Sequence, residues 1–356
     1  MDNCCNLRSY AGVAGSGYRL FARHVLGDDL AGRGLYLLQS RLKAPVDSVA
    51  RRGCCVAKAI GMTRSRANLV ALLAAVAWGL GNVSQKTILH HLDGFSATGL
   101  TSIVGAVFLW PFLQHERRQN LPPAKGSFDL ILKISLLFTF AATAMQFGYG
   151  HTTVTNAGFL VNTSAAITPI IGWLCFAHRP PPWIWLACGC TLIGVFLMAG
   201  SSVTGLSLGD GLALIAALMF AFWTVLLGQY VTRYRRPIQV TVVQLLICGG
   251  VCTWIGAATY GLPSFAAITA ALPELIIIGA ISKGLAYVLN ATAQQHIAPA
   301  CAAVIMSAES VFGSLSAMLI LGETLSVSRA VGAAFILFGV IIATAMPTAV
   351  AVRDRP

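Results

Sequence analysis

The sequence has little charge of either sign. Only 10% of its 356 residues are Asp, Glu, Lys or Arg, whereas a soluble domain carries about 25%. So few charges cannot cover the surface of a globular protein of this length, which argues against a soluble enzyme, a nucleic-acid-binding protein and a disordered chain. A lipid bilayer tolerates the 56% hydrophobic composition, either as helices or as a closed barrel.

Long apolar runs decide between helices and a barrel. Strands of a membrane barrel alternate apolar and polar residues over about 10 positions, whereas this sequence has continuous apolar runs of about 20 residues, the length of a membrane-crossing helix. We therefore predict an all-α integral membrane protein with ten transmembrane helices. The expected spans are 67–86, 95–113, 129–149, 152–176, 183–201, 209–229, 239–260, 272–292, 299–321 and 328–348.

Acidic residues are scarcer than basic ones, and the net charge is +12. Most of the excess lies in residues 1–66, which carry a net charge of +7, and the remainder lies in short loops beside the spans. With the N-terminus inside, seven basic residues fall in cytoplasmic loops and two fall outside, which follows the positive-inside rule. We expect cytoplasmic termini, a bacterial inner or plasma membrane, and no nucleic-acid partner.

The N-terminal segment differs from the rest of the chain. Residues 1–61 have no apolar run that could span a bilayer and no apolar core of a secretory signal. Met62 precedes Thr-Arg-Ser-Arg and then an apolar run, as at the start of a membrane protein. Residues 1–66 are therefore interpreted as an extension, either untranslated before Met62 or a disordered cytoplasmic tail.

The sequence also lacks the clusters that catalysis and metal binding need. Two close cysteine pairs, Cys188-Gly-Cys190 and Cys248-x-x-x-Cys252, lie in apolar runs without nearby His or carboxylate residues, and buried Cys behaves there as a small hydrophobe. A phosphate-binding Gly-Lys-Ser/Thr loop is absent. We predict no metal site, no cofactor and no catalytic residues, so the chain is not expected to be an enzyme.

An internal repeat divides the apolar part of the chain. Ala71–Trp78 reads against Ala213–Phe220, and Ala157–Gly172 reads against Ala298–Gly313, at spacings near 141 residues. The copies, 67–201 and 209–348, contain five spans each. Because five is odd, the second copy enters the membrane inverted, as in many secondary transporters.

The sequence resembles the drug/metabolite transporter superfamily, in its EamA-like branch of ten-helix carriers. The resemblance is carried by Ala74-Ala-Val-Ala-Trp78-Gly79, by Ser307-Ala-Glu309-Ser-Val-Phe-Gly313, by Leu321-Gly322-Glu323 and by Phe338-Gly339-Val340. Two departures are Cys175-Phe-Ala-His178 in place of the first copy's Leu-Gly-Glu, and Ser310 in place of a proline. The resemblance implies a secondary carrier of a small metabolite or drug that does not hydrolyse ATP.

Two ionisable residues are expected near the middle of the membrane. Glu309 and Lys283 lie about 15 Å and 13 Å along their helices at 1.5 Å per residue, and the hydrocarbon core is about 30 Å thick. Because the two helices are consecutive and antiparallel, a Lys283–Glu309 ion pair is within reach. Such a pair either holds the helices together or borders the substrate path, where Glu309 exchanges a proton or Lys283 meets an anion; alternatively, Glu309 stays neutral and only forms hydrogen bonds.

Uncharged polar residues at depth complete the candidate site. Asn162, Tyr287, Asn82 and Gln146 could line a cavity or could simply bond neighbouring helices. The resulting hypothesis is a secondary transporter of a small metabolite that works by alternating access in the lipid bilayer. The sequence leaves the coupling ion open, and protons are one candidate. A proton-coupled exporter of lipophilic cations and a non-transporting accessory membrane protein remain as alternatives.

Overall fold

The computed structural model describes residues 62–119, 126–152, 154–176, 180–199, 207–321 and 326–346. Residues 1–61 therefore lie outside the described residues, and so do Glu323, His178 and the C-terminal end after residue 346. The interpretation of the N-terminal extension stays a prediction.

Within these ranges every regular element is helical. The first five spans are formed by α3 (Arg64–Thr87) with η2 (Ile88–His90), α4 (Gly94–Arg118), α5 (Phe128–His151), α6 (Val154–Asn162) with α7 (Ser164–Phe176), and α8 (Pro182–Ala199). The second five are formed by α9 (Leu208–Tyr234), α10 (Pro237–Tyr260), α12 (Leu272–Ile276) with η3 (Ile277–Leu285) and α13 (Ala286–Ala293), α14 (Pro299–Met306) with α15 (Glu309–Leu321), and α16 (Val327–Ala345). A short helix, α11 (Phe265–Ala270), precedes the eighth span.

The lengths and compositions of these segments suit a bilayer. Nine of the described segments are long and apolar enough to cross a membrane, and α8 supplies a shorter apolar helix. Large apolar residues also lie on the outside of the bundle, for example Trp254 and Leu174, each of which is 73% exposed. These features confirm the all-α membrane fold with nine to ten spanning helices.

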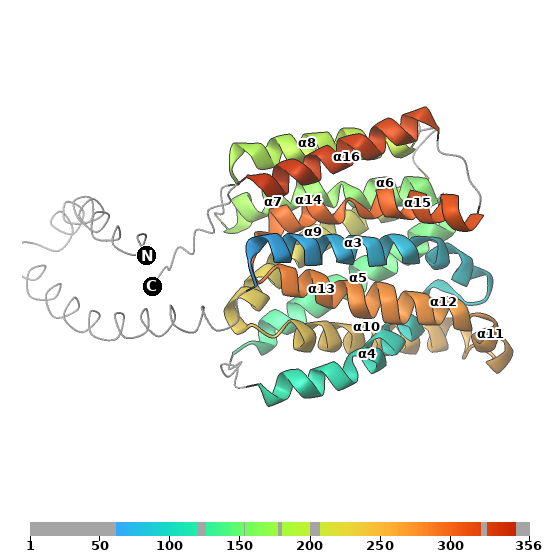
Figure 1. The fold of residues 1–356 in the computed structure, drawn as a ribbon. Coiled ribbons are helices and arrows are strands. Elements are labelled where there is room, and N and C mark those ends of the chain that lie inside the picture. The colour runs from blue at the N-terminus through green and yellow to red at the C-terminus, as the bar shows by residue number, and fades with distance from the viewer. Residues whose placement is uncertain are drawn as a thin grey trace, which may run out of the picture. The chain divides into compact units, whose positions relative to one another are not determined.

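Helices pack in pairs that join the first five spans to the second five. α4 packs against α10, α8 packs against α16, and α7 packs against α14 (Figure 1). The third span, α5, packs against the sixth, α9, while the first span, α3, packs against the eighth, formed by η3 and α13. Exchanging the two halves of the chain reproduces this set of partners.

Glycines allow the closest of these approaches. On α8 and α16, a Cβ atom added to Gly194 would lie 2.5 Å from the carbonyl oxygen of Gly332, and one added to Gly332 would lie equally close to that of Gly194. Because no side chain intervenes, the two backbones meet directly, which is how small residues promote helix association in membranes.

The fourth and ninth spans are each broken into two helices. The first break is at Thr163, whose hydroxyl donates to the carbonyl oxygen of Leu160 at 2.6 Å. The second is at Ser307 and Ala308, where the Ser307 hydroxyl donates to the carbonyl oxygen of Val304 at 2.6 Å. Such hydroxyl bonds compete with the helical ladder, so both spans are interrupted in their interior, where the sequence predicted continuous helices.

Candidate functional site: a cavity between the two broken spans

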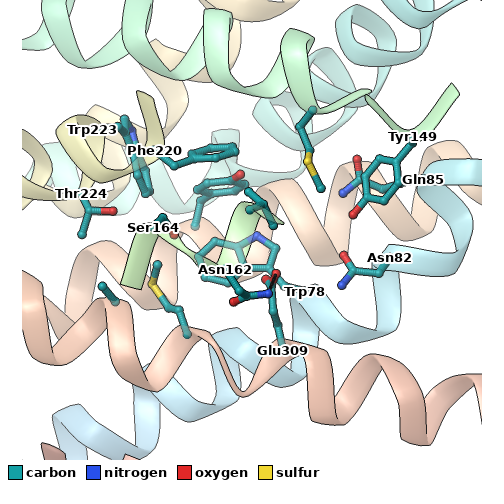
Figure 2. Close-up of a pocket in the computed structure, with 15 residues that line it drawn as sticks. Trp78, Asn82, Gln85, Tyr149, Asn162, Ser164, Phe220, Trp223, Thr224 and Glu309 are labelled. Atoms are coloured by element: carbon teal, nitrogen blue, oxygen red, sulfur yellow. Dashed lines mark hydrogen bonds between the residues drawn. The ribbon is translucent and has the colours of Figure 1, made fainter. Parts of the chain in front are cut away.

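A cavity of about 90 Å³ lies between helices of both halves of the chain. Figure 2 shows its walls, with polar and aromatic side chains directed into one space. The residues that line it are Trp78, Asn82, Gln85, Met145, Tyr149, Val161, Asn162, Ser164, Phe220, Trp223, Thr224, Tyr287, Ala303, Met306 and Glu309. The cavity therefore draws on the first, third and fourth spans of one half and the sixth, eighth and ninth spans of the other.

Glu309 and Asn162 meet across the two helix breaks. Glu309 is the first residue of α15, and Asn162 is the last residue of α6. The amide nitrogen Nδ2 of Asn162 donates to Oε1 of Glu309 at 3.4 Å, to the hydroxyl of Ser310 at 2.9 Å and to the carbonyl oxygen of Gly158 at 2.7 Å. Their side chains lie next to each other in Figure 2. The interrupted spans thus bring an acid and an amide together inside the bundle.

One acidic side chain, that of Glu309, provides the charge in the described wall of the cavity. Among its described lining residues, Glu309 is the only carboxylate, and none is Lys, Arg or His. A buried carboxylate without a cation is costly, so a proton or a positively charged ligand must balance Glu309 whenever water is excluded.

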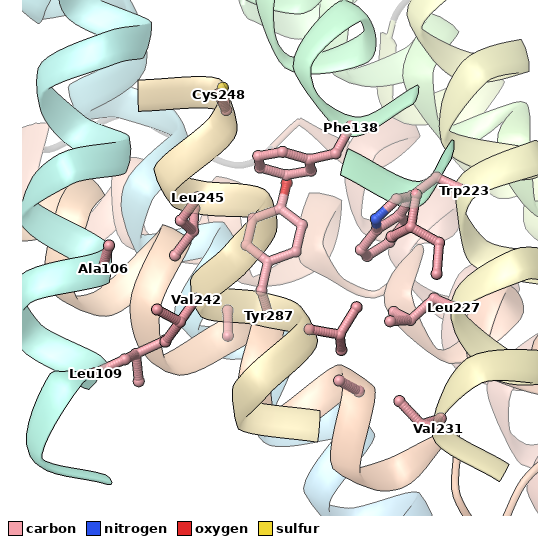
Figure 3. Packing of buried hydrophobic residues seen from close by; sticks show 14 of the residues in the cluster. Ala106, Leu109, Phe138, Trp223, Leu227, Val231, Val242, Leu245, Cys248 and Tyr287 are labelled. Atoms are coloured by element: carbon pink, nitrogen blue, oxygen red, sulfur yellow. The ribbon is translucent and has the colours of Figure 1, made fainter. Parts of the chain in front are cut away.

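Aromatic rings form a rigid wall of the cavity around Tyr287. The ring of Tyr287 lies 4.9 Å from that of Trp78, 5.0 Å from that of Phe138 and 5.4 Å from that of Trp223, measured between centroids. All three pairs are nearly perpendicular, the edge-to-face arrangement that aromatic pairs prefer. Figure 3 shows Phe138 and Trp223 beside the Tyr287 ring within the buried cluster.

Four of the six predicted site residues line this cavity: Glu309, Asn162, Tyr287 and Asn82. Gln146 does not line it. Its side chain is buried, and its Nε2 donates to the carbonyl oxygen of Gln85 at 2.8 Å, so it supports a lining residue from behind.

Lys283 also lies elsewhere, and the expected Lys283–Glu309 ion pair is not formed among the described residues. The Lys283 amine donates instead to the carbonyl oxygen of Thr98 and to the hydroxyl of Ser102, both on α4 and both at 3.0 Å. Residue spacing gives a position along a helix, but it does not fix the direction in which the side chain points. Lys283 lies in the π-helical segment η3, whose wider turns change the angle between successive side chains.

Several lining residues were missed from the sequence, among them Phe220, Trp223, Thr224 and Gln85. The repeat contained a usable signal for one of them, because its alignment places Phe220 of the second copy opposite Trp78 of the first. No comparable pattern distinguishes Gln85 or Thr224 from polar residues that only bond neighbouring helices.

Relatives of similar length carry names that describe transporters. The chain is 28% identical over 290 residues to an "Uncharacterized transporter" of Archaeoglobus fulgidus, covering 79% of this chain and 87% of that protein. It is 23% identical over 327 residues to an "Uncharacterized transporter" of Methanothermobacter thermautotrophicus, covering 86% of this chain and 94% of that protein.

A solved structure supports the fold. It is titled "Crystal structure of protein" and matches with a TM-score of 0.65 at 16% identity, covering 80% of this chain and 98% of its own. The model of the EamA-like transporter family matches residues 65–200 and again residues 207–345. The chain is an integral multi-pass membrane protein and belongs to the EamA-like transporter family.

Proposed function

We propose that this protein is a secondary transporter that moves a small metabolite through the Glu309 cavity by alternating access. The observation that carries the proposal is the position of Glu309, half-buried at the break between α14 and α15 and facing Asn162 at the break between α6 and α7. Interrupted helices at mid-membrane are where secondary transporters place substrates and coupling ions.

Protons are the coupling ion in this proposal. Glu309 has one hydrogen-bond donor, Asn162, and no basic residue among the described walls of its cavity. When the cavity closes, the carboxylate needs a proton to avoid an uncompensated buried charge. When the cavity opens to water, the proton can leave, so proton binding is linked to the side on which the cavity is open.

A second candidate function is proton-coupled export of lipophilic cations. The aromatic wall favours it, because Trp78 and Trp223 both pack against Tyr287 beside a single carboxylate. Aromatic faces attract organic cations, and Glu309 would neutralise such a cation in place of a proton. A neutral or zwitterionic metabolite would use the same wall for apolar contact.

The proposed motion needs two halves that exchange roles. An inverted repeat of 67–201 and 209–348 provides them, and the reciprocal packing of α5 on α9 and of α3 on η3 and α13 supports it. We propose that one group of helices rocks against the other around the cavity.

The orientation in the membrane has its own test. We propose cytoplasmic termini in a bacterial inner or plasma membrane, and reporter fusions can check the sides. Fusions after residue 125 and after residue 235 should report inside, and one after residue 205 should report outside. An outside signal after residue 235 would contradict the ten-span topology.

Purified protein in liposomes tests the transport proposal. Counterflow is measured for a panel of metabolites and a panel of lipophilic cations, each with and without a pH gradient. Transport of a metabolite driven by the gradient supports the first candidate, and transport of cations alone supports the second. Silence on both panels contradicts both and favours an accessory role. Glu274→Gln serves as a matched control, because Glu274 is an acid outside the cavity walls.

A further inference from the structure

A second buried polar cluster surrounds Lys283 on the side facing α4 and α10. The Lys283 amine bonds the hydroxyl of Ser102 at 3.0 Å, and this hydroxyl lies 3.4 Å from the sulfur of Cys248. The sulfurs of Cys248 and Cys252 are 4.0 Å apart, and the Thr143 hydroxyl lies 3.2 Å from that of Cys252. None of these residues lines the Glu309 cavity.

The cluster is enclosed and contains no carboxylate among its described contacts. Lys283 is 6% exposed, Cys248 is 0% exposed and Cys252 is 1% exposed. Its neighbours on α4, Thr98 and Ser102, offer only a carbonyl and a hydroxyl. A buried ammonium group needs a negative partner, and the thiols of Cys248 and Cys252 are the groups here that can supply one by losing a proton.

Helix geometry argues against a disulfide between the two sulfurs. Cys248 and Cys252 lie four residues apart within α10, where Cβ atoms are about 5–6 Å apart. A disulfide requires about 3.5–4.5 Å between Cβ atoms. Closing the bond would distort a helix that packs closely on α4, so the pair is better suited to share a ligand than to join.

Contrary to the expectation from the sequence, we propose that Cys248 and Cys252 bind one soft monovalent metal ion, of the class of copper(I) or silver(I), with Lys283 as the counter-charge. With metal–sulfur bonds of about 2.3 Å, two thiolates lie about 3.8 Å apart at a tetrahedral angle and about 4.6 Å apart in a linear arrangement. The observed 4.0 Å lies between these limits. Thiolate sulfur is the ligand that copper(I) prefers.

Charge balance selects a monovalent ion. Two thiolates, one monovalent cation and one lysine ammonium sum to zero, whereas a divalent ion would leave a net positive charge inside the bundle. Starting from one ammonium–thiolate pair and one thiol, binding forms two metal–sulfur bonds, breaks one S–H bond and releases one proton. No electron transfer is needed. This site would be independent of the transport proposed for the Glu309 cavity.

The experiment is a copper(I) titration of the full chain in detergent under reducing conditions. Bicinchoninate competes for the metal and reports the free ion. The double variant Cys248→Ser/Cys252→Ser should bind one copper(I) ion fewer per chain than the unmodified protein. The matched control Cys188→Ser/Cys190→Ser alters a cysteine pair that is buried on another helix, α8, and should keep that ion. Lys283→Met should weaken binding by about tenfold or more, a loss of about 1.4 kcal/mol.

Two further measurements use the unmodified protein, so they do not depend on whether a variant folds. X-ray absorption of the copper-loaded protein should show sulfur neighbours only, and peptide mapping of the unmodified protein should find Cys248 and Cys252 reduced. The proposal is overturned by equal copper uptake in the two double variants, by loss confined to the control, or by a native Cys248–Cys252 disulfide. If the serine variants do not insert, the alanine pair replaces them in the same comparison.

Discussion

Glu309 and Lys283 are both ionisable and lie on consecutive membrane-spanning segments, but Glu309 is half-buried and Lys283 is buried, and their surroundings differ. Glu309 lies at a helix break and faces a cavity that it shares with Asn162. Lys283 lies in an unbroken π-helical segment and is packed against α4, with hydroxyl and thiol groups around it. Glu309 therefore borders a cavity, whereas Lys283 is enclosed by protein.

The comparison shows that a buried charge is not sufficient to indicate a transport site. Charged residues in spans are rare because they cost about 3 kcal/mol at the helix centre on insertion scales, so both residues drew attention for the same reason. What separates them is the space beside them, which depends on how the helices pack. Variants at the two positions should therefore differ in kind, as the following predictions set out.

The largest effect is expected for Glu309→Gln. The glutamine keeps an oxygen that can accept the hydrogen bond from Asn162, but it cannot release a proton. Uptake driven by a pH gradient should fall to the level of protein-free liposomes, while substrate binding and thermal stability are retained. Uptake, substrate binding and thermal stability are measured on the same preparation. Normal pH-driven uptake by the folded variant would eliminate Glu309 as the proton carrier.

Replacing Lys283 should change stability rather than transport. Lys283→Met keeps a side chain of similar length and removes the buried ammonium, and a thiolate that had balanced it can take up a proton. With both charges gone, the free energy of unfolding should stay the same or rise by about 1–3 kcal/mol. Uptake in liposomes should remain near that of the unmodified protein. A loss of uptake as complete as that of Glu309→Gln would show that Lys283 takes part in transport.

A double-mutant cycle sharpens the comparison further. Because Lys283 and Glu309 form no ion pair and share no hydrogen-bond partner among the described residues, their effects on stability should add. The coupling energy of Glu309→Gln with Lys283→Met should stay below about 0.5 kcal/mol. Denaturation of all four proteins in the same detergent measures it, and a coupling above about 1 kcal/mol would restore the ion pair expected from the sequence.

The smallest effect is expected at His296, which lies between the eighth and ninth spans. Burial holds the pKa of His296 below its ordinary value of 6.5, and Arg235 acts in the same direction, while a backbone hydrogen bond to Thr292 opposes them. The unfolded chain therefore takes up this proton first as pH falls. Stability should be complete above pH 6.5 and should decrease as pH falls from 6.5 through the folded pKa.

Melting temperatures at several pH values, compared with those of His296→Gln, test this effect. The variant should show a flatter dependence below pH 6.5, and its pH-driven uptake should match that of the unmodified protein. An identical slope in both proteins would assign the pH dependence to another group. The result separates a titration that only affects folding from the one proposed at Glu309.

Much of the fold was predictable from local patterns. Apolar runs placed the spans, and four of six proposed site residues line the cavity. The breaks at Thr163 and Ser307 were not predicted, because serine and threonine are common within membrane helices and only some of them interrupt the helical ladder. Trp223 was missed because aromatic residues in apolar runs most often pack against other helices or lipid.

The sequence by itself determined that the chain crosses a membrane and roughly where each span lies along the chain. These properties follow from the transfer of individual residues into lipid and from the constant rise of a helix, neither of which depends on neighbouring spans. Only the tertiary structure decided that Glu309 meets Asn162 and a cavity, while Lys283 meets Ser102, whose hydroxyl contacts the Cys248 thiol. The direction in which a side chain points depends on the helix breaks, the π-helical turn and the glycine contacts, which set how the helices pack.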